Sequence, residues 1–161
     1  MRRQAHRYFA GVHWARVAPM DGAVPTIFVA NHSNWWDGFL AYLTTRALGL
    51  RFQIMMEARN LARYRAFLRV GAVPLRRTSA RGAYEDLEAA RRYVVPGAAM
   101  WIFPQGERSP ASARPVNCER GVAHIALGMD RPVRICPVAF RYGYVGEQLP
   151  EAFVLVGEPW A

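Results

Sequence analysis

The stretch VPTIFVANHSNWWD, residues 24–37, decides how this chain folds. Its first half is almost entirely apolar and opens beside Pro25, a pattern typical of a buried strand. A polar turn follows, and a helical pattern then starts at Asn34 or Asp37 and continues to Leu48. A buried strand that passes through a polar turn into a helix predicts one unit of an α/β domain.

The same alternation continues along the chain. Strand patterns cover the segments 51–57, 72–77, 98–103, 133–140 and 152–156. Helical patterns cover 58–70 (with Leu61, Tyr64 and Leu68 on one face), 80–95 (where Ser79 can cap the helix) and 119–129. Residues 104–118 contain three prolines and no periodicity, which indicates a loop. This order predicts a single α/β domain over 1–161, with a mixed, largely parallel sheet flanked by helices and its core at 24–157.

The segment before the first strand has a different pattern. In residues 2–17, apolar side chains recur at helical spacing between four arginines. This pattern predicts a basic amphipathic helix, with residues 1–20 facing a membrane. A helix that packs its apolar side on its own domain has the same pattern, and Gly11 weakens both interpretations.

The excess of basic over acidic residues indicates which partners the protein binds. The chain has 21 basic residues, all of them arginine, against 12 acidic ones, for a formal charge of +9. The planar guanidinium suits phosphate, so the expected partners are anionic: phospholipid headgroups, a phosphorylated substrate, an acidic carrier protein or nucleic acid. Codon bias would also produce arginine in place of lysine, but it does not explain the shortage of acidic residues. Nucleic acid is disfavoured because no zinc knuckle, RNP-like strand or recognition-helix pattern is present.

Location is indicated by what the chain does not contain. No signal-peptide pattern follows the first arginines, and the apolar runs are far shorter than a membrane-spanning helix requires. Cys118 and Cys136 form neither a CxxC pair nor a metal-ligand spacing, which fits two idle thiols in a reducing cytoplasm. We therefore expect a protein that does not cross a membrane by itself.

Three polar clusters follow predicted strands: 31–37, Arg76-Arg77 and 105–108. Because ligands bind at the carboxyl ends of parallel strands, we expect these clusters to share one site. Within the first cluster, Asp37 can hold the imidazole of His32, which then acts as a general base worth roughly 10²–10⁴-fold in rate. A capped helix with a structural histidine is the alternative, and without a GxSxG motif a serine-elbow hydrolase is not supported.

Four segments, taken in order, resemble the phospholipid-biosynthesis acyltransferase family of the NHx4D type, which includes glycerol-phosphate and lysophosphatidate acyltransferases. The matching residues are Asn31, His32 and Asp37; Gly71, Leu75 and Arg77; Phe103, Pro104, Gly106, Arg108 and Ser109; and Pro137-Val138. The segment 119–121 is also similar to the basic-glycine step that follows the third family block. The resemblance covers about residues 24–157 and implies a glycerol-phosphate-acyltransferase-like fold.

The resemblance also implies a reaction. His32, held by Asp37, deprotonates the hydroxyl of a lipid acceptor, such as 1-acyl-glycerol-3-phosphate, which attacks the thioester of acyl-CoA or acyl-carrier protein. The substrate-binding residues implied are Arg77, Gln105, Gly106 and Arg108. No metal, no other cofactor and no covalent acyl-enzyme are implied. The expected location is cytoplasmic, peripheral on the inner face of a membrane that contains anionic lipid.

The third block departs from the family pattern. Gln105 stands where the family has Glu, Glu107 stands where it has Thr, and in the second block Arg76 replaces a usual acid. A carboxylate at Glu107 would weaken phosphate binding unless it pairs with Arg76 or Arg77. Two alternatives therefore remain. One is the same chemistry on a non-phosphorylated lipid, glycosylated or amino-acid linked; the other is a lipid-binding module without turnover, which the intact His32 and Asp37 disfavour.

Overall fold

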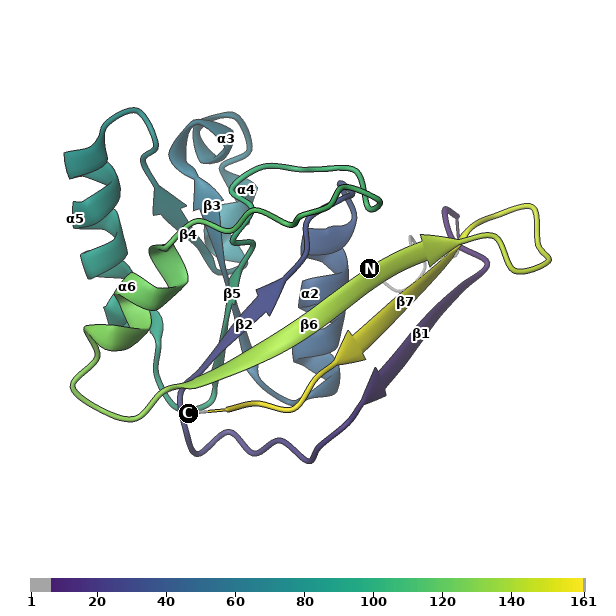
Figure 1. The fold of residues 1–161 in the computed structure, drawn as a ribbon, viewed down its shortest axis with the longest axis horizontal. Coiled ribbons are helices and arrows are strands. Elements are labelled where there is room, and N and C mark those ends of the chain that lie inside the picture. The colour runs from purple at the N-terminus through teal and green to yellow at the C-terminus, as the bar shows by residue number, and fades with distance from the viewer. Residues whose placement is uncertain (1–6, 161) are drawn as a thin grey trace.

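The computed structural model describes residues 7–160. Its centre is a seven-stranded sheet in the order β1-β7-β6-β2-β5-β3-β4 (Figure 1). The strands are β1 (Gly11–Arg16), β2 (Thr26–Ala30), β3 (Arg51–Glu57), β4 (Ala72–Leu75), β5 (Ala98–Ile102), β6 (Arg134–Gly143) and β7 (Glu151–Val156). The five strands from β6 to β4 are parallel, β7 runs antiparallel to β6, and β1 runs parallel to β7. The predicted α/β class with a mixed, largely parallel sheet is confirmed.

Helices cover both faces of the parallel part of the sheet. They are α2 (Asp37–Ala47), α3 (Ala58–Arg63), α4 (Ala66–Arg69), α5 (Ala80–Ala90) and α6 (Gly121–Leu127), with the 3₁₀ turn η1 (Arg91–Tyr93) after α5. Leu40 of α2 and Leu61 of α3 belong to one core cluster, and Ala90 of α5 and Ile125 of α6 belong to another. Within residues 7–160, no helix is long and apolar enough to span a membrane.

The central strands are apolar on both faces because they separate these two clusters. In β2, Ile27 faces the cluster under α5 and α6, while Phe28 faces the cluster under α2. Met100 and Trp101 divide in the same way in β5. Successive side chains of a strand point to opposite faces, so a strand covered on both sides needs an unbroken apolar run.

A buried polar contact fixes the position of α2 on the sheet. The indole N–H of Trp101 donates to Thr45 Oγ1 at 2.7 Å, and the Thr45 hydroxyl donates to the carbonyl of Ala41 at 2.8 Å. Both polar side chains are fully buried, and each donor has its acceptor. The contact orients the helix whose first residue is Asp37.

The predicted helix over 2–17 is wrong where the structure describes it. Residues 11–16 form β1, which pairs with β7 along its whole length, and residues 1–6 of the prediction lie outside the described part. β7 has a free edge of backbone donors and acceptors, and pairing with it satisfies those groups. Val12 and Trp14 also favour extended backbone, and Gly11 disfavours a helix. The sheet therefore begins well before the core predicted at 24–157.

The single helix predicted over 58–70 is also wrong, because the backbone breaks at Tyr64 (φ −126°, ψ 63°) between α3 and α4. The break directs both Leu61 and Phe67 towards the same core cluster, which a continuous helix would not do. As a result Tyr64 and Leu68, predicted to be internal, are 49% and 48% exposed. The other predicted elements are found with their ends shifted by a few residues, and Ser79 caps α5 by accepting from Gly82 N–H at 3.0 Å.

Candidate active site

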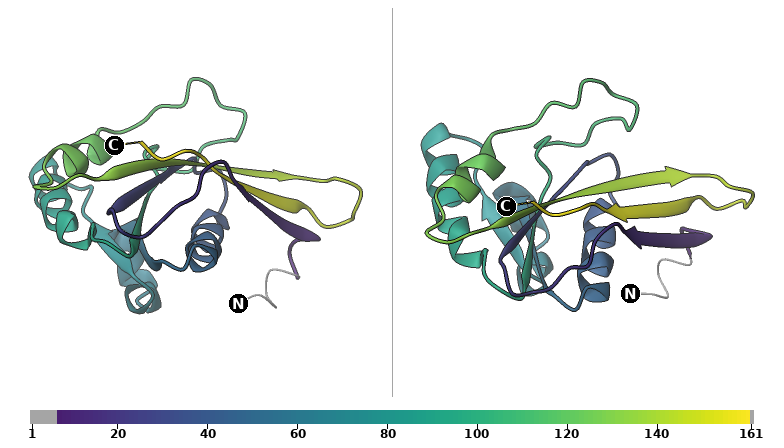
Figure 2. Two further views of the ribbon diagram at one scale, coloured as in Figure 1. Left: turned by 90° about the horizontal axis from the view of Figure 1, so that it is seen from below. Right: turned by 60° about the horizontal axis from the view of Figure 1, so that its bottom comes forward.

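The polar segments that follow β2 and β5 are joined by hydrogen bonds. The backbone N–H of His32 donates to Gln105 Oε1 at 2.6 Å, and the N–H of Ser109 donates to the carbonyl of His32 at 2.9 Å. The Gln105 amide also donates to Ser109 Oγ at 2.9 Å. The loop after β5, which projects from the sheet in Figure 2, is therefore fastened to the turn after β2. This confirms that two of the predicted clusters share one site.

His32 and Asp37 form the predicted pair. The Nδ1–H of His32 donates to Asp37 Oδ2 at 2.8 Å; Asp37 is fully buried, whereas the His32 side chain is 23% exposed. The Phe103 ring stacks on the imidazole at 4.4 Å between centroids, which limits its rotation. With its Nδ1 proton engaged, the imidazole carries its lone pair on Nε2, which has no hydrogen-bond partner in the described structure. This geometry suits a general base.

Asp37 is the first residue of α2, and the turn before that helix wraps around its carboxylate. Oδ2 accepts from the backbone N–H groups of Ser33 at 2.7 Å and Asn34 at 2.8 Å, besides His32. Oδ1 accepts from the hydroxyl of Tyr142. Four donors at the positive end of a helix offset the cost of burying a charge, which explains how the carboxylate is kept out of water.

Tyr142 is a site residue that the sequence analysis missed. It lies near the end of β6, and burial, followed by its hydrogen bond to Asp37, raises its pKa far above the ordinary value. The phenol is therefore a permanent donor to Asp37. A signal for it existed in the strand pattern, because Cys136, Val138, Phe140 and Tyr142 alternate toward one face. The strand predicted over 133–140 ended too early to include it.

Asn31 has a structural role in this arrangement. Its side-chain amide donates to the carbonyl of Phe140 at 3.0 Å and accepts from the N–H of Phe140 at 2.7 Å. The side chain thus continues the β2–β6 ladder by one step beyond Ala30. It holds the turn that carries His32 against the strand that carries Tyr142.

Arg77 lies beside the loop after β5, and Gly106 lets it approach. The guanidinium donates to the carbonyl of Gly106 and to Glu119 Oε1, the latter at 3.3 Å. Gly106 has φ +74°, and a Cβ there would lie 2.9 Å from Arg77 Nη2, so a side chain is excluded by conformation and by space. Arg77, Gln105 and Gly106 are therefore brought together as predicted. Arg108 is exposed and has no hydrogen bond or ion pair to any described residue.

The suggested pairing of Glu107 with Arg76 or Arg77 is wrong. Arg76 binds Asp86 through Nε at 2.9 Å and Nη2 at 2.8 Å, and Arg77 binds Glu119 instead. The Arg76 guanidinium, through this hydrogen bond, lowers the pKa of Asp86 below its usual range. Arg76 therefore fastens the end of β4 to α5 and does not face Glu107. Among residues 7–160, no three histidine, cysteine or acidic side chains lie together as metal ligands would.

Comparison with known proteins assigns the chain to a family. The family described as Acyltransferase matches residues 12–141, which extend from β1 through most of β6 and include the His32–Asp37 pair; Tyr142 lies one residue beyond the match. Neither the curated proteins nor the solved structures gave a significant match. The chain therefore belongs to the acyltransferase family, of the glycerol-phosphate and lysophosphatidate acyltransferase type, and is an acyltransferase that transfers an acyl group from an acyl donor to a lipid acceptor.

Proposed function

We propose that this acyltransferase moves a fatty acyl group from acyl-CoA or acyl-carrier protein to a lysophospholipid such as 1-acyl-glycerol-3-phosphate. His32 is the general base and Asp37 its partner. The observation that supports this most directly is the imidazole held through Nδ1 by a buried carboxylate, with Nε2 left without a partner in residues 7–160. The formal charge of +9 suits both anionic substrates and a membrane with anionic lipid, and we place the enzyme on the cytoplasmic face of such a membrane.

The proposed reaction proceeds through a tetrahedral intermediate. Nε2 of His32 takes the proton of the acceptor hydroxyl as its oxygen attacks the thioester carbonyl carbon. Asp37 stabilises the imidazolium that forms. The intermediate then collapses, the carbon–sulfur bond breaks, and the imidazolium returns its proton to the leaving thiolate. The acyl group ends as an ester on the acceptor, and the base is regenerated.

Arg77 is the proposed ligand for the acceptor phosphate. A guanidinium has five N–H donors, and the contacts to Gly106 and Glu119 engage only part of them. Gln105 brings no charge, and its amide is already occupied by His32 N–H and Ser109 Oγ. The engagement of Arg77 by Glu119 also favours a second candidate. A non-phosphorylated acceptor, such as a glycosylated or amino-acid lipid, would leave that ion pair intact.

Substitutions at Arg77 and Glu119 separate the two acceptors. Arg77→Gln should raise KM for lysophosphatidate roughly 10- to 100-fold, the worth of a charged hydrogen bond, and leave KM for the acyl donor unchanged. Glu119→Gln should lower KM for lysophosphatidate, because it frees the guanidinium. The measurement is transfer of a labelled acyl group to lysophosphatidate, glycerol 3-phosphate or a total lipid extract. Product from the extract alone, with Arg77→Gln as active as wild type, would support the non-phosphorylated acceptor.

Tyr142 is the proposed positioning residue for Asp37. Tyr142→Phe should lower kcat by about tenfold with KM unchanged, because a hydrogen bond to a charged group contributes about 1.5–3 kcal/mol and part of it orients the carboxylate. Tyr144→Phe is the matched control, since Tyr144 is exposed just beyond the same strand. A merely structural role would predict a lower melting temperature for Tyr142→Phe without any change in the kcat of the folded protein.

A further inference from the structure

We propose that the surface formed by Tyr64, Arg65, Leu68, Arg69 and Val70 docks the enzyme on an anionic lipid bilayer. We call it the α4 surface. The inference deepens the proposed function, since a lysophospholipid acceptor has to be reached in a membrane. It also moves the membrane contact away from the N-terminal segment, whose residues 11–16 form a strand and not an interfacial helix.

The α4 surface combines exposed apolar side chains with arginines, as interfacial segments do. Tyr64 and Leu68 are about half exposed and Val70 is also exposed, while Phe67 of the same short helix packs against the core. The backbone break at Tyr64 is what presents these side chains outward. Apolar side chains beside basic ones can enter the acyl boundary while the guanidinium groups remain at the phosphates.

The positive charge of the α4 surface favours a bilayer that contains anionic lipid. Residues 58–70 contain four arginines and no acidic residue. Ion pairs among the described residues involve Arg59, Arg76, Arg77, Arg81, Arg91, Arg131 and Arg134. Arg65 and Arg69 are in none of them. Arginines that are not neutralised by the protein itself are available to lipid phosphates.

A pocket beside α4 extends this basic surface. It encloses about 290 Å³ and is lined by Arg46, Arg51 and Arg69, none of which has an ion pair to a described residue. Gln53 also lines it, is only 8% exposed, and has a side-chain oxygen without a hydrogen-bond partner in residues 7–160. Three arginines and an unsatisfied amide suit a headgroup that offers both phosphate and hydroxyl, as phosphatidylglycerol does.

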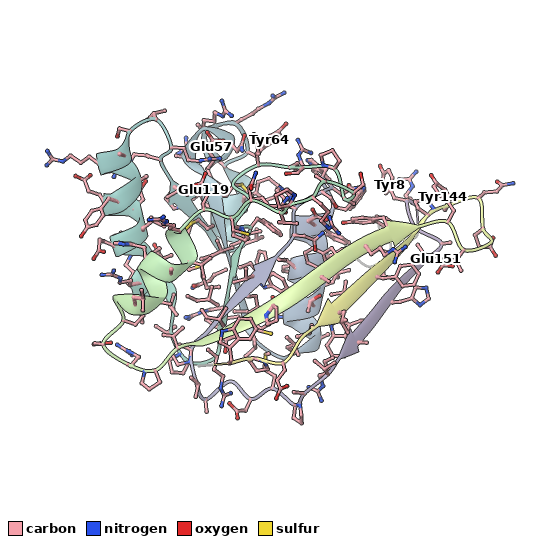
Figure 3. All side chains as sticks on the ribbon, viewed as in Figure 1. Tyr8, Glu57, Tyr64, Glu119, Tyr144 and Glu151 are labelled. Carbon is pink, nitrogen blue, oxygen red and sulfur yellow. The ribbon has the colours of Figure 1, made fainter. Side chains whose placement is uncertain are left out.

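The Tyr64 end of the α4 surface follows the edge of the sheet that carries the active site. α3 begins directly after β3, at the carboxyl edge of the sheet where β2 and β5 deliver His32 and Gln105. Phe67, Trp36 and Phe103 pack against one core cluster, so α4 and the site cover the same face. Figure 3 shows Tyr64 and Glu57 at this edge. The Arg69 end, with the pocket at Arg46 and Arg51, lies toward the amino ends of β3 and β4. Docking through this surface would therefore lay the α3–α4 side of the protein along the lipid.

The test compares two double variants of the full chain that make the same chemical changes in different places. Leu68→Ser/Arg69→Gln alters the α4 surface. Leu127→Ser/Arg92→Gln makes the same changes on the opposite side of the sheet, beside α5 and α6, where Leu127 is 87% exposed and thus more exposed than Leu68. Binding is measured by sedimentation with phosphatidylcholine vesicles, with and without phosphatidylglycerol. We expect the α4 variant to bind the anionic vesicles on the order of tenfold more weakly than wild type, with the control unchanged.

Activity separates this inference from the proposed function. The α4 variant should lose transfer to an acceptor in vesicles but keep transfer to a short-chain acceptor dispersed as monomers. His32→Gln should bind vesicles like wild type. If the chain transferred no acyl group to any acceptor while its α4-dependent vesicle binding persisted, the docking surface would stand and the proposed reaction would fail.

Three results would overturn the docking surface. One is equal vesicle binding by the two double variants. Another is wild-type binding that does not depend on phosphatidylglycerol. The third is a wild-type dimer, formed without lipid, that Leu68→Ser/Arg69→Gln converts to monomers, since a second copy would then cover this surface.

Discussion

His32→Gln should lower kcat by about 10³-fold and leave the fold intact. Glutamine can still donate to Asp37 Oδ2, so the buried carboxylate keeps its fourth donor, but it offers no nitrogen lone pair to take the hydroxyl proton. Loss of a general base costs roughly 10²–10⁴-fold, and the remaining site still orients both substrates. The measurement is steady-state acyl transfer, with circular dichroism and the melting temperature recorded on the same preparation.

His13→Gln is the matched control for that experiment. His13 also contacts a carboxylate, Glu151 at 2.8 Å, but on the exposed edge strand β1 and outside the site. It should transfer acyl groups like wild type. A folded His32→Gln protein that retained a tenth or more of wild-type kcat would show that another group takes the proton.

The parallel part of the fold could be predicted because its central strands, β2 and β5, are buried on both faces. Such strands need unbroken apolar runs, and the runs of β2 and β5 are plain in the sequence. β1 could not be predicted in this way, because five of its six residues are exposed and no burial pattern marks it. Its conformation is set by the free edge of β7, a partner about 140 residues away in sequence.

The candidate site was also predictable only in part, because some of its contacts are local in the sequence and others join distant segments. His32 and Asp37 lie in one turn, so the sequence showed that the two side chains can meet. The hydrogen bond from Tyr142 joins residues 105 positions apart and depends on the register of β6 beside β2. The occupation of Arg77 by Glu119 likewise depends on how the loop after β5 returns to α6. The pair of neighbouring residues could be found in the sequence, whereas its contact with Tyr142 and the contact of Arg77 with Glu119 depend on tertiary structure.

Asp37→Asn should lower kcat by about 10³–10⁴-fold, as much as the loss of the base itself or more. An asparagine at position 37 can place its NH₂ at either of the two carboxylate oxygen positions. If the NH₂ replaces Oδ2, it faces the imidazole and also the N–H groups of Ser33 and Asn34, so those two backbone donors lose their acceptor. Nδ1 then becomes the acceptor and the proton moves to Nε2, which removes the lone pair needed for catalysis. If the NH₂ faces Tyr142, the hydroxyl loses its acceptor and the imidazolium loses its stabilising charge. Both outcomes cost rate, and both leave a folded chain.

The double variant His32→Gln/Asp37→Asn distinguishes a functional pair from two separate contributions. Residues that act as one unit are non-additive, so the double variant should be about as slow as the slower single variant. Additive losses, near the product of the two factors, would mean that Asp37 acts on the reaction independently of His32. The geometry favours the first result, because Asp37 is fully buried and holds the imidazole directly through Oδ2.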